Sequence, residues 1–165
     1  MSLMRALRHL FATRFGMRRR FSDSTLGAIE QAVREVEARH AGEIRFAVET
    51  ALDLPELWQG VGARERALQV FGQLGVWDTE GNNGVLIYVL FAEHDVEIVA
   101  DRAIAQRASQ AEWDAITRRV EDEFRAGRFE AGSVAGVRAV GELLARHFPA
   151  RGGDRNEQPN QPVLL

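Results

Sequence analysis

The feature that most constrains the fold of this chain is the uninterrupted apolar run GVLIYVLFA at residues 84–92. A run of this kind is typical of a central strand that is covered on both faces. A short polar turn follows at residues 93–95, and residues 96–101 form a second apolar stretch that ends in Asp101. A turn this short makes the two strands antiparallel neighbours. We therefore expect a buried hairpin inside a sheet.

Strand and helix patterns alternate around this hairpin. Residues 43–49 alternate apolar and polar side chains, as a half-covered strand does, and residues 50–60 are expected to form a loop. Two strands joined through a helix form a parallel pair with a right-handed crossover. The order therefore predicts an α/β fold, a three-layer α/β/α sandwich with a small mixed central sheet. The expected helices are residues 23–39, 61–75, 109–126 and 130–148.

The two ends of the chain differ from the domain between them, which we place at residues 21–148. Residues 1–20 carry six Arg and no Asp or Glu, and their apolar residues recur at helical spacing. Such a basic amphipathic helix could pack on the domain or a partner, contact an anionic membrane surface, or be an organellar presequence. Residues 149–165 are rich in Gly, Asn, Gln and Pro and are expected to be disordered.

Charge and composition exclude several classes of function. Outside residues 1–21 the chain has 15 Arg against 24 Asp and Glu, and this acidic balance argues against nucleic acid as a partner. The absence of Cys and Lys removes thiolate metal sites, cysteine nucleophiles and Schiff-base chemistry. Nucleotide-binding and common hydrolase motifs are also absent, so we expect no nucleotide or organic cofactor. No segment has the length of a membrane span, so the expected location is the cytoplasm, with the membrane surface as the alternative.

The loop DTEGNNG at residues 78–84 places side-chain oxygens just before the central strand. Oxygens at Asp78, Glu80 and Asn82 repeat every second residue, as in the first half of a calcium loop. The glycine and the closing glutamate of that loop are replaced here by Asn83 and Val89, so the segment is not an EF-hand. Gly and Asn also suit an ordinary tight turn, which is the alternative interpretation.

Two further acidic residues could reach the same end of the sheet. Glu43 begins the first strand and Asp101 ends the hairpin, so a suitable register would bring both close to the loop. Calcium or magnesium is the natural occupant of such a group of oxygens. A local salt bridge or a cap of the following turn is the alternative role for Asp101. At the junction of the last two helices, Arg125 and Arg128 could contact an anion or could be solvated charges.

Three segments carry a family signature, namely NNGVLIYV, EIVAD and FRAGRFEAG. They resemble the TPM domain, a family that includes thylakoid-lumen proteins and short bacterial members, and the likeness covers about residues 21–148. The resemblance implies an α/β/α sandwich and a divalent-cation-binding or protein-interaction module with an unidentified protein partner. The alternatives are a weak metal-assisted acid phosphatase, which rests on the resemblance, and a membrane-peripheral adaptor, which rests on the basic amphipathic residues 1–20. The site residues that the resemblance implies are Asp78, Asn82, Asn83, Glu43 and Asp101.

Overall fold

A four-stranded mixed sheet forms the centre of the protein, in a computed structural model that describes residues 3–150 and 156–165. The strand order is β3-β2-β1-β4; β1 is parallel to β2 and β4, and β3 is antiparallel to β2. The strands are β1 (Glu43–Glu49), β2 (Gly84–Leu90), β3 (Asp95–Ala100) and β4 (Val163–Leu164). The predicted parallel pair and hairpin are confirmed, and β4 is an additional strand.

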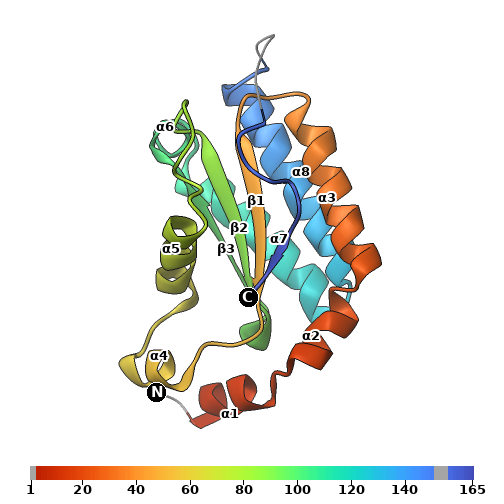
Figure 1. Cartoon of the computed structure of the whole chain (residues 1–165), viewed down its shortest axis with the longest axis vertical. Coiled ribbons are helices and arrows are strands. Elements are labelled where there is room, and N and C mark those ends of the chain that lie inside the picture. The colour runs from red at the N-terminus through yellow and green to blue at the C-terminus, as the bar shows by residue number, and fades with distance from the viewer. Residues whose placement is uncertain (1–2, 151–155) are drawn as a thin grey trace.

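Helices cover both faces of this sheet (Figure 1). The helices are α1 (Leu3–Phe11), α2 (Arg14–Arg20), α3 (Asp23–Glu37), α4 (Leu54–Gln59), α5 (Ala63–Gln73), α6 (Arg102–Ala105), α7 (Gln110–Arg125) and α8 (Phe129–His147), and the short 3-10 helix η1 (Phe91–Glu93) lies in the hairpin turn. One face of the sheet packs on α3, α7 and α8, and the other packs on α4 and α5. This is the α/β/α sandwich that the sequence predicts.

The alternation of side chains along the strands divides the core into two apolar clusters. Ile87 and its neighbours two residues away face α3, α7 and α8, whereas Leu86 and Tyr88 face α4 and α5. β2 is buried along its whole length, as its apolar run predicts. β1 is also buried throughout, so the expectation of a half-covered strand at residues 43–49 is wrong. Its polar residues are covered by α5 and by the C-terminal segment, defined here as residues 156–165.

Residues 3–20 form two helices where the sequence predicts one. Ala12 and Thr13 separate them, and the Thr13 side chain caps α2 by accepting a hydrogen bond from the Gly16 N–H at 3.0 Å. The expected loop at residues 50–60 contains the short helix α4. Its start is fixed by a capping box between Asp53 and Glu56.

The C-terminal segment is ordered, which corrects the expectation of disorder for that part of residues 149–165. β4 pairs with the outer edge of β1, and the Leu165 N–H donates to the Val48 carbonyl at 2.8 Å. The backbone groups of this edge would otherwise lack a partner in the sheet, so pairing outweighs the polar composition of the segment. Residues 151–155 of the predicted tail lie outside the described residues.

Candidate functional site

The predicted site residues lie at the end of the sheet where β1 and β2 begin and β3 finishes, the upper end in Figure 1. Glu43 is the register partner of Gly84. On the other side, the Asp101 N–H donates to the Gly84 carbonyl at 2.9 Å. Glu43 and Asp101 therefore flank one residue of the central strand, which is the register that the predicted grouping required.

Gly84 is required at this place because another part of the backbone crosses it. A Cβ atom at Gly84 would lie 2.0 Å from the carbonyl oxygen of Val76, which no side chain tolerates. The loop that follows Val76 is held by hydrogen bonds of its backbone groups. The Asn83 N–H donates to the Thr79 hydroxyl at 3.1 Å, and the Asn82 carbonyl accepts from the Ala103 N–H at 3.2 Å. The loop is thus tied to both β2 and α6.

Two side-chain oxygens at this end are buried and have no hydrogen-bond partner within the described residues. They are Oδ1 of Asn83 and Oδ2 of Asp101. The amide nitrogen of Asn83 donates to the Ala41 carbonyl, which fixes the orientation of that side chain. Oδ1 of Asp101 accepts from the Arg102 N–H at 2.6 Å, so Asp101 also caps α6, as its alternative role predicts. A buried acceptor without a donor is costly and needs a physical reason.

The C-terminal segment brings contacts to this site that the sequence did not indicate. The Gln158 N–H donates to Oε2 of the buried Glu43 at 3.1 Å. Oε2 of Glu157 accepts from the Glu80 N–H at 3.0 Å, so an additional carboxylate lies against the loop. Asp78, Glu80 and Asn82 are themselves exposed. No local pattern signals these partners, because they are far from β1 and the loop in sequence.

A cavity of about 520 Å³ lies next to Glu43 and is lined by α3, the start of β1 and the C-terminal segment. Glu37 accepts hydrogen bonds there from the Ile44 N–H at 2.9 Å and from the Asn160 amide at 2.6 Å. Burial raises the pKa of the Glu37 carboxyl to about 7, and the charge of Glu43 adds to the effect. Glu37 therefore titrates near neutral pH, which the sequence did not reveal.

His40 lines the same cavity and is almost fully buried. Its Nδ1 accepts from the Gly42 N–H at 3.2 Å, whereas Nε2 has no partner within the described residues. Burial lowers the pKa of His40 to about 4, so the imidazole is neutral at physiological pH. The cavity thus combines a neutral imidazole with the carboxyl groups of Glu30, Glu37 and Glu43.

Comparison with known proteins decides the family. Residues 18–143 match the model of the TPM domain, which covers more than half of the chain. The chain belongs to the TPM-domain family. Among solved structures, the BA42 protein of the psychrophilic bacterium Bizionia argentinensis is 30% identical, with a TM-score of 0.77 over 87% of this chain and 94% of that chain.

Two further solved structures share the fold of this TPM domain at 19% identity. The N-terminal domain of the cg2496 protein from Corynebacterium glutamicum has a TM-score of 0.54 over 74% of this chain and 73% of that chain. The N-terminal domain of a protein from P. gingivalis has a TM-score of 0.58 over 79% of this chain and 82% of that chain. A search of curated proteins finds no match.

The described part of this TPM domain holds no group of three or more His, Cys, Asp or Glu side chains that could hold a metal ion. A cation at the upper end of the sheet would therefore need amide or backbone oxygens beside the carboxylates. Asn83 and Asp101 are the residues that can offer such oxygens from buried positions. Asp78 and Glu80 of the neighbouring loop are exposed.

The arginines predicted as an anion contact lie elsewhere in the TPM domain. Phe129, which follows Arg128, packs against His94 of the hairpin turn with 5.5 Å between the ring centroids. This is the opposite end of the sheet. Arg125 forms ion pairs with Glu121 and Asp122 on its own helix, and Arg128 pairs with Glu123 at 2.6 Å. Both guanidinium groups already have carboxylate partners.

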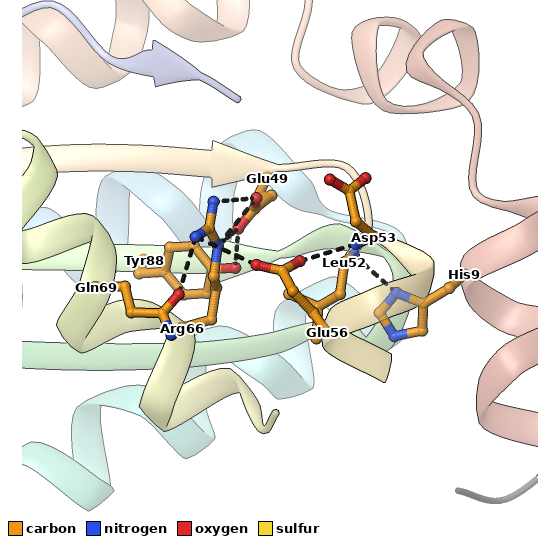
Figure 2. A network of polar contacts seen from close by, with 8 residues as sticks. All are labelled: His9, Glu49, Leu52, Asp53, Glu56, Arg66, Gln69 and Tyr88. Carbon is orange, nitrogen blue, oxygen red and sulfur yellow. Dashed lines mark hydrogen bonds and ion pairs between the residues drawn. The ribbon is translucent and has the colours of Figure 1, made fainter. Parts of the chain in front are cut away.

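A second polar network lies where β1 ends (Figure 2). The Arg66 guanidinium donates to both carboxylate oxygens of Glu49, at distances between 2.8 and 3.1 Å, and the Tyr88 hydroxyl donates to Oε2 of Glu49 at 2.5 Å. Glu56 adds an ion pair to Arg66 at 3.3 Å. Burial, together with the Glu49 carboxylate, raises the pKa of Tyr88, so the phenol stays protonated. The Arg66 guanidinium is paired with the carboxylates of Glu49 and Glu56, which indicates that this network has a structural role.

Proposed function

We propose that this TPM domain is a divalent-cation-binding module whose ligands come from the upper end of the sheet. The observation that carries the proposal is the pair of buried side-chain oxygens, Asn83 Oδ1 and Asp101 Oδ2, that accept no hydrogen bond within the described residues. Calcium or magnesium would give both oxygens a partner, because both ions prefer carboxylate, amide and carbonyl oxygens.

The charge distribution around these oxygens supports a cation. Asp78, Glu80 and Asp101 belong to the loop and the end of the hairpin, and Glu157 of the C-terminal segment contacts the loop. The exposed Arg102 directly follows Asp101 in sequence, and a second exposed arginine, Arg107, lies just after α6. Carboxylates that repel one another gain most from a bound cation.

Binding of a cation would also order a surface. The loop, α6 and the C-terminal segment meet at this end through single hydrogen bonds, such as that between Glu80 and Glu157. A shared ion would hold these segments in one arrangement, and this ordered surface is the place where we propose that a protein partner binds. Cation binding and protein interaction are then two steps of one function.

The experiment is a titration of the ¹⁵N-labelled protein with CaCl₂ and, separately, with MgCl₂, followed by amide chemical shifts. We expect saturable shifts in residues 78–84 and 101–103. The variant Asp101→Asn should bind at least about tenfold more weakly because one ligand charge is lost, while α6 keeps its cap, since Asn is as good an N-cap as Asp. Asp122→Asn, at an exposed position of α7, is the matched control and should bind as the wild type does.

Two results would refute the proposal. One is the absence of amide shifts at millimolar calcium and magnesium, and the other is equal affinity of Asp101→Asn and the wild type. The same bound cation would also support metal-assisted hydrolysis of a phosphomonoester. A phosphomonoester assay of the wild type and Asp101→Asn, run with the cation that the titration identifies, decides that extension.

A further inference from the structure

Helix α1 turns its apolar face toward solvent. Its apolar residues fall on one side of the helix, and those that are exposed are Leu3, Met4, Leu7, Leu10 and Phe11. The exposed fractions of Leu10 and Phe11 are 70% and 75%. A surface helix of a globular protein normally buries this face, so the orientation of α1 is the reverse of the usual one.

The reversal arises because the polar face of α1 is the side that docks on the domain. Arg5 and His9 both contact Oε1 of Glu93 at 2.6 Å, and His9 is buried. Nδ1 of His9 also accepts from the Leu52 N–H at 3.0 Å, as Figure 2 shows, and Arg5 donates to the Val61 carbonyl at 2.7 Å. These four polar contacts fix the orientation of the helix.

The docking contacts also keep Glu93 ionised. Burial alone would raise the pKa of the Glu93 carboxyl, but the hydrogen bonds from His9 and Arg5 outweigh burial and hold this pKa below its ordinary value. The carboxylate that anchors α1 is therefore charged at neutral pH. The charged, partly buried Glu93 therefore holds α1 in the orientation that exposes its apolar face.

Exposed positive charge is concentrated on α1 and α2. Residues 3–20 contain no Asp or Glu, and Arg5 is the arginine whose charge is used for docking. The other arginines of α1 and α2 are exposed, and so is Phe15, with an exposed fraction of 79%. They are Arg8, Arg14, Arg18, Arg19 and Arg20.

The same end of the molecule carries further exposed apolar residues on α4. Leu52 and Val61, which bond to α1, lie just before and just after α4, so the two helices are neighbours at the lower end of Figure 1. Leu54 and Trp58 of α4 are 62% and 75% exposed. Tryptophan is enriched where proteins meet the headgroup region of a bilayer.

We propose that α1 and α2 bind the surface of an anionic phospholipid bilayer, with the apolar face of α1 and Phe15 inserted at the headgroup boundary and the exposed arginines against the headgroups. Charge complementarity selects this occupant, because a second copy of the chain would bring five uncompensated arginines against five others. No helix among the described residues is long and apolar enough to cross a membrane, so the contact lies in the plane of the surface. This function is independent of the cation site, which lies at the opposite end of the sheet.

The experiment is sedimentation of the full chain with vesicles of phosphatidylcholine and phosphatidylserine in a 7:3 ratio, compared with phosphatidylcholine alone. Binding should be stronger to the anionic vesicles and should weaken in 0.5 M NaCl. Each arginine near an anionic surface contributes about a fivefold change in partitioning, so Arg18→Gln with Arg19→Gln should weaken binding by about 25-fold. Leu10→Ser with Phe11→Ser should weaken it by about tenfold or more, because both side chains are transferred out of water on binding.

The control is Leu68→Ser, which removes an exposed leucine of α5 and should bind vesicles as the wild type does. Circular dichroism and size-exclusion chromatography of each variant check that it is folded, since all substituted positions are exposed. The proposal is overturned if the wild type does not bind anionic vesicles, or if the Leu10 and Phe11 variant binds them equally well. A third result would also overturn it. If the wild type forms a dimer and does not bind vesicles, and the Leu10 and Phe11 variant is a monomer, the apolar face of α1 binds a second copy of the chain.

Discussion

The buried carboxyl of Glu37 should make the stability of this protein depend on pH. Burial raises its pKa from 4.5 to about 7 in the folded state. The folded protein then holds this proton more tightly than the unfolded chain, so the stabilisation from the protonated form is complete below about pH 4.5 and is lost as the pH rises to about 7. A shift of about 2.5 units at about 1.4 kcal/mol per unit corresponds to roughly 3.5 kcal/mol, and residual solvent access reduces this to about 2–3 kcal/mol.

The substitution Glu37→Gln removes the titration while keeping an acceptor for the Ile44 N–H. The free energy of unfolding is measured by urea denaturation of both proteins between pH 5 and pH 8.5. The wild type should lose about 2 kcal/mol relative to Glu37→Gln over this range. His40 and Asp95, whose pKa values are also shifted, are present in both proteins and cancel in the difference.

The matched control is Glu35→Gln, which changes an exposed glutamate of the same helix. Its stability should follow the wild type in parallel across the whole pH range. A constant difference between the wild type and Glu37→Gln from pH 5 to pH 8.5 would refute the reasoning. It would mean that the carboxyl is solvated well enough to ionise at its ordinary pKa in the folded state.

Two further predictions concern close packing and a buried hydrogen bond, and both are measured as changes in the free energy of urea unfolding. Gly84→Ala should destabilise the protein by about 3 kcal/mol or more because its Cβ would collide with the Val76 carbonyl, whereas Gly72→Ala, where a Cβ meets nothing within 4 Å, should stabilise α5 by about 0.5 kcal/mol. Similar losses in the two variants would contradict the close approach at β2. Tyr88→Phe should cost about 1–3 kcal/mol because Glu49 loses a buried donor, and a loss below about 0.5 kcal/mol would show that water replaces the hydroxyl.

The periodicity of the chain predicted the strands and long helices because those elements bury a regular apolar face. The predicted strand at residues 43–49 coincides with β1, and the apolar run at residues 84–92 contains β2. Two elements that the sequence did not predict, α4 and β4, form for other reasons. α4 is six residues long and depends on the capping box of Asp53 rather than on periodicity, and β4 forms because the edge of β1 offers backbone partners.

The candidate site was predictable in its residue types but not in its contacts. Oxygen side chains before β2 and after β3 indicated a polar end of the sheet, and the register brings Glu43 and Asp101 to either side of Gly84. The contributions of Glu157 and Gln158 come from more than 70 residues away in sequence, so no local pattern reveals them. The orientation of α1 was equally hidden, because an amphipathic pattern does not say which face docks.

The docking of the C-terminal segment on β1 has a consequence for the order in which the protein folds and opens. The contacts of Gln158 with Glu43 and of Asn160 with Glu37 close loops of 115 and 123 residues, whereas β2 and β3 pair across a short turn. Closing loops of this length is slow relative to local strand pairing, and few apolar contacts stabilise the docked segment. We therefore expect the segment to dock last, to release first, and to show the fastest amide hydrogen exchange of the sheet at Leu165. Each such release exposes the outer edge of β1 and the carboxyl of Glu37 to water while the hairpin and the helices stay folded.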